Sequence, residues 1–439
     1  MKKRLNNMKL IPFFLLLLCV FEMNAQQTLT LEEAIKTALE NNYEIKIAGN
    51  NVKISETNIS AGNAGMLPKV TATVVDNNGI QNLSQTRADG TVNSLDNAKN
   101  NSLNYGVGLD WTIFDGFGMF AKHDQLKALK ELGETQLKQT ILMKVSDVTA
   151  IYYDLVQQQQ QLNALDTTIV ISKQRLNLAQ NRFTIGKASK LEVLNAQVDL
   201  NTDTTTLLRQ KELFANTKIA LNQQLARDTK LDFKVIPEIK IDNQLLLQNL
   251  TELAFKQNLE LQKMVVNKRI SELQLKQVKG TRYPTVRVLS GYNFAETKSD
   301  LGFTTQTSSR GLNYGFSASL NLFDGFNQNR AEKVAKLEIE NTQVAIDQQN
   351  KTLESQLNSA FQTYLTNLEL VQLEEKNEAI AKQNLDITLE KFRIGTITTL
   401  EFRTAQLNYI NAKVRNTNTQ YQAKLSEIAL KELAGNLSF

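Results

Sequence analysis

Cysteine and histidine are almost absent from this chain of 439 residues, since each occurs only once. A single cysteine and a single histidine exclude a disulfide framework and a His/Cys metal cluster. The HExxH, phosphate-loop and GxSxG motifs of metalloproteases, nucleotide-binding proteins and serine hydrolases are also missing. His123 lies near the start of a predicted helix, where a surface or packing role is expected. The sequence therefore predicts no catalytic residue, no metal site, no cofactor and no enzyme activity.

The lone cysteine, Cys19, belongs to an amino-terminal segment with the three parts of a secretory signal peptide. A basic start precedes an apolar run at 10–21 and a short end at Ala25, where cleavage is expected. The run is too short to span a bilayer comfortably, and the leucines before Cys19 lack the small residue of a lipidation site. Residues 1–25 carry four positive charges and one negative charge, so the net charge of +5 becomes +2 in the mature chain. This small charge predicts no nucleic-acid partner.

Proline is scarce as well, since only Pro68, Pro237 and Pro284 follow the predicted signal peptide. Two proline-free stretches, 118–182 and 328–391, carry apolar residues largely at three-and-four spacing, which predicts amphipathic helices. About 65 residues at 1.5 Å each would make each helix roughly 100 Å long if unbroken. Shorter helices are predicted at 31–61, 191–227, 245–279 and 400–433.

Two blocks of sequence occur twice at a constant offset of 209 residues. The block at 103–117 returns at 312–326 with eight identities in fifteen positions, and the block at 183–197 returns at 392–406 with seven in fifteen. Chance supplies about one identity in twenty positions, so the chain is read as two copies of one unit. The constant offset means that the long segment between the blocks has kept its length.

Between the predicted helices the hydrophobic period changes from 3.6 to 2. Apolar residues alternate with glycine or polar residues over 105–113 and again over 314–322. Such alternation over about ten residues is the pattern of a transmembrane β-barrel strand, and each segment has a partner strand upstream that begins at Pro68 or Pro284. A half-buried hairpin in a soluble sandwich is the alternative interpretation.

These patterns predict a signal peptide, two repeats and a linker. The signal peptide is expected at 1–25, the first repeat at 26–227, the linker at 228–244 and the second repeat at 245–439. Each repeat is expected to run as helix, β-hairpin, long helix, tip and helix. The hairpins are predicted at 67–114 and 283–323, and the tips at 184–190 and 393–399.

Four strands cannot close a barrel, because single-chain barrels start at eight strands and open edges are not tolerated in hydrocarbon. Two copies would give eight strands, which are largely filled by side chains, so a duct favours three copies and twelve strands. The predicted fold class is an α+β membrane protein. Its duplicated long coiled-coil-like helices form an α-barrel, and two β-hairpins per chain contribute to a trimeric 12-stranded transmembrane β-barrel.

The chain resembles the TolC-like outer-membrane efflux protein family, also called outer membrane factors, over essentially its whole mature length. The duplication, the Phe-Asp-Gly segments at 114–116 and 323–325, and the tip motifs at 182–194 and 391–401 carry the resemblance. It implies a homotrimer in the outer membrane of a Gram-negative cell that extends into the periplasm and contacts outer-membrane lipid. The implied partners are a periplasmic membrane-fusion adaptor and an inner-membrane RND or ABC pump. The implied function is the exit duct of a tripartite efflux or type I secretion system.

The resemblance also implies roles for individual residues. Tip residues expected to dock the adaptor are Arg182, Phe183, Gly186, Leu191, Gly395 and Leu400. Entrance or gate candidates are Phe392, Ile397, Glu401 and Thr404. The strand-to-helix junctions are Phe114, Asp115 and Gly116 in the first copy and Phe323, Asp324 and Gly325 in the second.

At several of these positions the chain departs from the family pattern. Phe183 and Phe392 stand where tyrosine is frequent, and Ile397 and Thr404 are apolar or neutral, so polar locking pairs of relatives do not transfer. Two rival functions remain open on the sequence. One is a periplasmic coiled-coil adaptor or scaffold, which would not explain the two hairpins. The other is a stand-alone outer-membrane channel without pump partners.

Overall fold

The computed structural model describes residues 28–301 and 304–436. The predicted signal peptide, with Cys19 and Ala25, lies outside these residues. The chain divides into two compact units, which we call the tip unit and the sheet unit. The tip unit consists of the described residues within Met1–Lys46, Gln139–Asn258 and Thr352–Phe439, and the sheet unit consists of those within Ile47–Lys138 and Leu259–Lys351.

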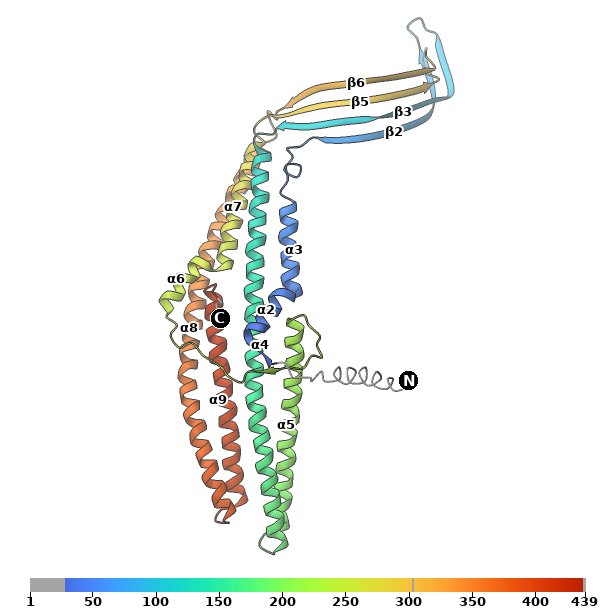
Figure 1. Ribbon diagram of the computed structural model, residues 1–439. Coiled ribbons are helices and arrows are strands. Elements are labelled where there is room, and N and C mark those ends of the chain that lie inside the picture. Colours follow the sequence, from blue (N-terminus) through green and yellow to red (C-terminus); the bar gives the residue numbers. More distant parts are fainter. Residues whose placement is uncertain (1–27, 302–303, 437–439) are drawn as a thin grey trace, which may run out of the picture. The chain divides into compact units, whose positions relative to one another are not determined.

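The helices of the two repeats have matching lengths (Figure 1). Helices α4 (Gly118–Thr184) and α8 (Asn327–Arg393) have 67 residues each. Helices α5 (Lys190–Gln224) and α9 (Thr399–Leu433) have 35 residues each. Their ends differ by 209 positions, which is the offset of the repeated sequence blocks. The predicted duplication is therefore visible in the helices themselves.

Each repeat opens with two helices where the sequence predicted one. The first repeat has α2 (Leu31–Asn41) and α3 (Tyr43–Thr57), and the second has α6 (Leu247–Gln257) and α7 (Leu259–Gly280). An asparagine, Asn42 or Asn258, stands at each break with an extended ψ, 130° or 120°. The prediction of unbroken helices over 31–61 and 245–279 was wrong at these two positions.

The side chain of Asn42 explains why the helix can stop and restart there. Its Oδ1 accepts the backbone N–H groups of Glu44 and Ile45 at 2.9 and 3.3 Å, which caps the new helix. Its Nδ2 donates to the carbonyl of Gln224 at 2.9 Å, near the end of α5. Asn258 makes the equivalent bond to the carbonyl of Leu433 in α9 at 3.1 Å. The two asparagines therefore tie each opening helix to the closing helix of its own repeat.

The strands form one antiparallel sheet of four in the order β2-β3-β5-β6 (Figure 1). Strands β2 (Lys69–Thr86) and β3 (Val92–Phe114) are the first hairpin, and β5 (Thr285–Ser299) and β6 (Gln306–Ser319) are the second. The repeats meet where β3 pairs with β5. Strands β2 and β6 are the two edges of this sheet. A short parallel pair, β1 (Thr28–Leu29) with β4 (Lys234–Val235), was not predicted.

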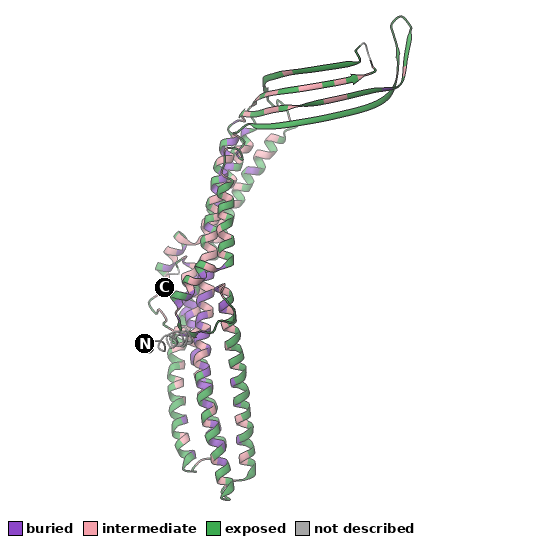
Figure 2. Cartoon of the chain, turned by 45° about the vertical axis from the view of Figure 1, so that its right-hand side comes forward, coloured by how far each residue is buried: buried purple, intermediate pink, exposed green. Residues whose placement is uncertain are grey.

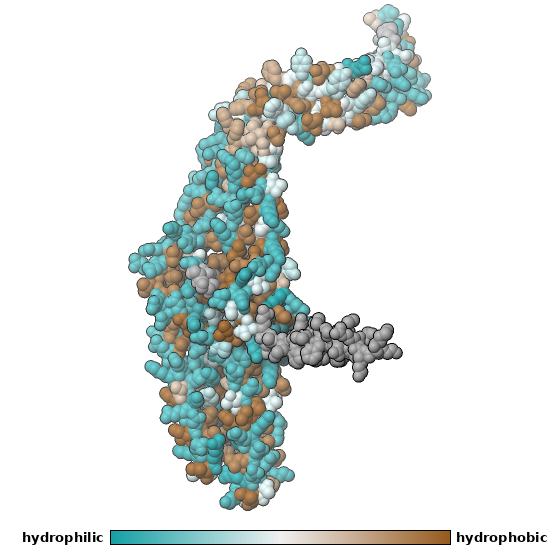
Figure 3. Space-filling model, in the orientation of Figure 1, coloured by the Kyte–Doolittle hydropathy of each residue, from teal (hydrophilic) through white to brown (hydrophobic). Residues whose placement is uncertain are grey.

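The register places apolar residues on one face of the sheet, because residues directly opposite each other share a face. Ala72, Val107, Tyr292 and Leu312 form one such row across all four strands. The full apolar face carries Val70, Ala72, Val74, Tyr105, Val107, Leu109, Trp111, Val288, Tyr292, Phe294, Leu312, Tyr314, Phe316 and Ala318. Figure 3 shows hydrophobic side chains gathered over the strands. The predicted alternation therefore produces a two-faced sheet.

The opposite face is mostly glycine and polar residues, with Val75 and Leu289 as apolar exceptions. It carries Thr71, Thr73, Asn104, Gly106, Gly108, Asp110, Arg287, Gly291, Asn293, Asn313, Gly315 and Ser317. Both faces of the strands are mostly exposed, and buried residues follow the helices instead (Figure 2). No helix among residues 28–301 and 304–436 is long and apolar enough to cross a membrane.

The main core of the tip unit lies where several helices meet the linker. Val148, Leu155 and Val156 of α4 pack with Leu221 of α5 and with Phe233, and all five side chains are buried. The hydroxyl of Tyr152 donates to the carbonyl of Leu29 at 3.1 Å, which fixes the short strand β1 against α4. Residues from α5, from β1 and from the linker thus hold α4 in place at this level.

Candidate functional site: the paired helical tips and the polar sheet face

The first tip is a tight turn that ends α4. The N–H of Lys187 donates to the carbonyl of Arg182 at 2.7 Å, and the N–H of Gly186 donates to the carbonyl of Phe183 at 2.9 Å. Gly186 has a φ of +74°, a left-handed conformation that a residue without a Cβ adopts without steric cost. This bond pair satisfies the last carbonyls of the helix. The turn is therefore dictated by the glycine.

The second tip repeats the same geometry at the end of α8. The N–H groups of Thr396 and Gly395 donate to the carbonyls of Lys391 and Phe392 at 3.0 and 3.1 Å, and Gly395 has a φ of +79°. An ideal Cβ on Gly395 would lie 3.8 Å from Nη2 of Arg182. The two tips therefore lie next to each other.

Both helices that leave the tips begin at a hydroxyl cap, Ser189 for α5 and Thr398 for α9, but only the second has the reciprocal bond of a capping box. Thr398 caps α9, and the carboxylate of Glu401 accepts the backbone N–H of Thr398 at 2.8 Å. This bond from the Thr398 backbone, helped by its hydroxyl, lowers the pKa of Glu401 below the ordinary value of 4.5. In the first tip, Glu192 instead lies 3.7 Å from Nη1 of Arg182. Both carboxylates are thus placed by the tip turns, but with different partners.

Large apolar side chains are exposed around both tips. Leu191 and Leu400 are 65% and 75% exposed, and Phe183 is 45% exposed. Phe392, the counterpart of Phe183, is only 2% exposed, because its ring stacks on Phe402 at a centroid distance of 4.9 Å. The two phenylalanines predicted from equivalent positions therefore have different environments.

The remaining gate candidates lie on either side of this buried ring. Ile397 is partly buried and packs against the cluster that contains Phe392 and Phe402. Thr404 is exposed, and its hydroxyl donates to the carbonyl of Leu400 in its own helix at 3.0 Å. The structure thus brings Ile397 into the second tip and leaves Thr404 on a helix surface.

A buried ion pair joins the two tip hairpins, and sequence reasoning missed it. Nη1 and Nη2 of Arg403 in α9 donate to the two carboxylate oxygens of Asp203 in α5, both at 2.8 Å. Asp203 also accepts the hydroxyl of Ser172 at 2.6 Å, and Gln406 donates to the same hydroxyl at 2.9 Å. All four residues are at most 9% exposed. We call Arg403, Asp203, Ser172 and Gln406 the latch network.

A second arginine, Arg175 of α4, extends this network. Its Nη2 bonds to Asp199 of α5, whose other oxygen lies 3.7 Å from Nε of Arg403. The repeat offers a signal that could have identified these residues. At an offset of 209, the position that corresponds to Arg403 is Leu194, that of Asp203 is Ala412 and that of Arg175 is Asn384. The charged residues of the network therefore have no charged counterpart in the other repeat.

The predicted strand-to-helix junctions are sharp turns in the sheet unit. Gly116 and Gly325 have φ values of +70° and +69°. The residues that follow, Phe117 and Phe326, also have positive φ values, +68° and +66°, which is unusual for a residue with a Cβ. Each ring packs edge-on against the phenylalanine three positions earlier in the chain, with centroid distances of 5.3 and 5.4 Å. Ring packing therefore accompanies the strained backbone in both copies.

The junction aspartates differ between the copies. Asp324 accepts the backbone N–H of Gln328 at 2.7 Å and so caps the start of α8. Oδ1 of Asp115 is buried, and no hydrogen-bond partner for it lies among the described residues. Gly116 is packed closely, since an ideal Cβ there would lie 2.1 Å from the carbonyl oxygen of Gly280. Only glycine fits this position.

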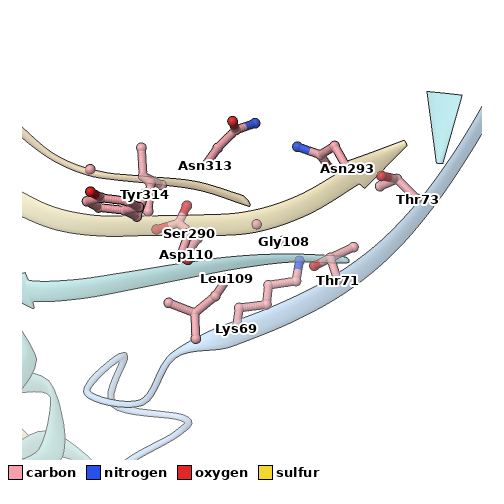
Figure 4. Close-up of a pocket in the computed structure, with 13 residues that line it drawn as sticks. Lys69, Thr71, Thr73, Gly108, Leu109, Asp110, Ser290, Asn293, Asn313 and Tyr314 are labelled. Carbon is pink, nitrogen blue, oxygen red and sulfur yellow. The ribbon is translucent and has the colours of Figure 1, made fainter. Parts of the chain in front are cut away.

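A shallow cavity of about 530 Å³ lies against the sheet (Figure 4). Thr71 and Thr73 line it from β2, and Asn293 and Asn313 line it from β5 and β6. Within 28–301 and 304–436, no group of three or more histidine, cysteine, aspartate or glutamate residues could hold a metal ion. The cavity lining combines hydroxyls, amides and glycine backbone with Lys69 and Asp110 and with the apolar Leu109, Leu289 and Tyr314.

Comparisons of the sequence with known proteins find outer membrane efflux proteins. The sequence profile described as Outer membrane efflux protein matches residues 34–227 and 250–436. The chain is 19% identical over 418 residues to the outer membrane efflux protein BepC of Brucella suis biovar 1 (strain 1330), a match that covers 93% of this chain and 86% of BepC.

Two solved structures share the fold. The CmeC outer membrane channel of Campylobacter jejuni superposes with a TM-score of 0.75 at 17% identity, over 92% of this chain and 85% of CmeC. The MtrE outer membrane channel of Neisseria gonorrhoeae, described in its open state, superposes with a TM-score of 0.66 at 15% identity, over 92% of this chain and 89% of MtrE.

Proposed function

The chain belongs to the outer membrane efflux protein family, and we propose that it forms the exit duct of a tripartite efflux or type I secretion system. Proteins of this family conduct substrates across the outer membrane of Gram-negative cells and work with periplasmic adaptors and inner-membrane pumps. The duct is passive, and the pump supplies the energy. The signal peptide, cleaved near Ala25, would deliver the chain to the periplasm.

The observation that carries the proposal is the two-faced sheet with two open edges. Val74, Tyr314 and Phe316 on its apolar face are 74%, 84% and 80% exposed, and lipid is the surrounding that would stabilise them. The edges, β2 and β6, have unpaired N–H and C=O groups that hydrocarbon does not tolerate. Three copies would pair β6 of each with β2 of the next. The proposed assembly is a homotrimer with a twelve-stranded barrel lined by the polar face.

The tips are the proposed entrance and docking surface for the adaptor. Exposed Leu191 and Leu400 offer apolar contacts, and Arg182 and Phe183 lie at the same end. Gly186 and Gly395 set the turns that present these side chains. Three copies of Glu401 would place a ring of carboxylates around the entrance.

The latch network is the proposed closure of that entrance. It joins α5 of the first hairpin to α9 of the second within one chain, so the hairpins cannot separate at this level without breaking the Arg403–Asp203 pair. Ile397 and Phe392 would move with the second hairpin, because they pack in one cluster with Phe402. Thr404, on the surface of α9, remains a gate candidate in the assembled trimer.

Membrane fractionation tests the first rival, because a periplasmic adaptor or scaffold would be recovered in the soluble fraction. A photo-crosslinking amino acid at Leu191 or Leu400 in the native cell tests the second. We expect adducts with one periplasmic adaptor protein from these positions. The same crosslinker at exposed Lys53 in α3 is the control and should give no such adduct. A membrane-embedded protein without adaptor adducts would instead be a stand-alone channel.

A further inference from the structure

A cavity of about 270 Å³ lies in the tip unit among α4, α8 and α9, and the passage of substrates through a duct does not require it. Most of its wall is apolar. Ile171 and Leu178 contribute from α4, Leu389 and Phe392 from α8, and Phe402 from α9. The stacked rings of Phe392 and Phe402 form a flat aromatic surface, with an angle of 14° between the ring planes. This volume lies just below the range of ligand pockets, which is ~300–1,000 Å³, so only a small ligand would fit.

A buried cation with unused donors also lines the cavity. The side chain of Arg175 is 2% exposed, and only its Nη2 has a partner, the carboxylate of Asp199. Among the described residues, no hydrogen-bond acceptor serves its buried Nε and Nη1. Buried N–H donors are nearly always paired, since an unpaired donor costs about 1–3 kcal/mol. The carboxylate of Asp203 accepts hydrogen bonds from Arg403 and Ser172 and makes none with Arg175.

Each arginine of the cavity wall has a carboxylate partner outside the lining, Asp199 for Arg175 and Glu390 for Arg393, so the unused N–H donors of Arg175 are what an anion would satisfy. Of the residues that line it, Arg175 and Arg393 are cationic and none is acidic. Exposed Arg393 and Gln174 mark the side that is open to solvent. A ligand that fits must therefore combine an apolar ring or chain of modest size with one negative group.

We propose that this cavity binds a small amphipathic carboxylate. Its carboxylate accepts hydrogen bonds from Nε and Nη1 of Arg175, which have no exposed surface in this structure and reach the ligand once the guanidinium turns toward the cavity. The apolar part of the ligand packs against Phe392 and Phe402. The walls come from both tip hairpins, so a bound ligand stabilises the arrangement in which the hairpins lie together. Carboxylate binding does not depend on the proposed export function, so each can fail without the other.

The test uses 2-naphthoate as the probe and 2-naphthamide as its neutral counterpart. The full mature chain is reconstituted in lipid nanodiscs, and binding is measured by isothermal titration calorimetry with empty nanodiscs subtracted. We expect saturable binding of 2-naphthoate, and at least roughly tenfold weaker binding of the amide, because charge-assisted bonds are about twice as strong as neutral ones. No saturable binding, or equal binding of the two probes, would overturn the proposal.

Three variants locate the site. Arg175→Met removes the donors and should weaken the binding of 2-naphthoate at least tenfold. The affinities of 2-naphthoate and 2-naphthamide should then be equal. Leu178→Trp fills the cavity, leaves the charges in place and should abolish binding of both probes. Arg209→Met is the matched control, since Arg209 is an exposed arginine of α5 that does not line the cavity. Unchanged binding in Leu178→Trp would place the probe elsewhere and contradict the proposal, even if Arg175→Met failed to fold.

Discussion

Nη2 of Arg403 lies 2.8 Å from Oδ1 of Asp203, although the two residues are 200 positions apart in the sequence. The pair belongs to different repeats and has no counterpart elsewhere in the duplication, because Leu194 and Ala412 occupy the equivalent positions. The two hairpins are therefore joined by charged residues that the repeat does not share between its copies.

Removing one partner of this pair should loosen both hairpins. Arg403→Met leaves Asp203 charged and buried, which typically costs 3–5 kcal/mol. Backbone hydrogen exchange near Asp203 in α5 and near Arg403 in α9 should become roughly a hundredfold faster, if exchange reports local opening. The double variant Arg403→Met with Asp203→Leu should recover most of the protection, because no unpaired buried charge remains and Arg175 keeps its partner Asp199. Arg209→Met is the control, and an equal loss of protection there would contradict a special role for the pair.

The capping contact of Glu401 predicts how the entrance responds to pH. Its pKa is lowered from 4.5, so its negative charge is present above that value and is lost only as pH falls through the lower folded-state pKa. The stability that the Glu401 carboxylate adds to the helix cap is likewise present at neutral pH and is lost as the pH falls through the lowered pKa. Reversal potentials in planar bilayers should show cation preference at pH 7 that persists to below pH 4.5.

Substitution at the same position separates charge from capping. Glu401→Gln keeps a side chain able to complete the capping box but removes the charge, so cation preference should fall while the tip stays folded. Glu390→Gln, an exposed carboxylate near the same tip, should change the reversal potential less. An unchanged potential in Glu401→Gln would exclude the carboxylate ring.

The tip glycines should tolerate alanine poorly even though there is room for it. Gly186 has no atom within 4 Å of an ideal Cβ, so a substitution there is opposed only by its positive φ. Gly186→Ala and Gly395→Ala should each destabilise the turn by roughly 1 kcal/mol and speed exchange about fivefold. Gly49→Ala, in helix α3 with equal free space and no positive φ, should be neutral or stabilising. Equal effects at all three positions would be inconsistent with backbone strain.

The junction phenylalanines allow a comparison of two small substitutions at one position. Phe326→Gly relieves the positive φ, whereas Phe326→Ala keeps the strain and loses the same ring contact with Phe323. The glycine variant should therefore be more stable than the alanine variant by about 1 kcal/mol, the reverse of their order in a helix. Hydrogen exchange at the start of α8 measures the difference. If alanine proves the better substitute, the backbone strain is not significant.

Neighbouring strand positions should respond in opposite ways to a charge. Phe316→Arg places a cation on the apolar face, at a cost of about 2–4 kcal/mol near the bilayer midplane. Gly315→Arg places it on the polar face, opposite Leu289 and with open space at the Cβ position, so the cost should be small. The yield of assembled protein in outer-membrane fractions should fall for the first variant and not for the second. The opposite order would mean that the two faces of the sheet are assigned the wrong way round.

The sequence predicted those parts of the fold that depend on local periodicity. Alternation at 105–113 and 314–322 predicted strands, the three-and-four spacing predicted the long helices, and the resemblance to outer-membrane efflux proteins is confirmed. The helix breaks at Asn42 and Asn258 were not predicted, because an asparagine can interrupt a helix without changing the apolar pattern around it. The latch network was not predicted, because an arginine among polar residues of a helix is expected to lie in solvent. Only the fold shows that its partner comes from the other repeat.

The equal lengths of α4 and α8, and of α5 and α9, limit how this protein can change. One residue inserted in a helix turns everything beyond it by about 100° and advances it by 1.5 Å. Such an insertion in α4 alone would carry Arg175 away from Asp199. Natural variants of this chain should therefore gain or lose residues in the strand hairpins and the linker, and almost never within a long helix unless the change comes in whole turns.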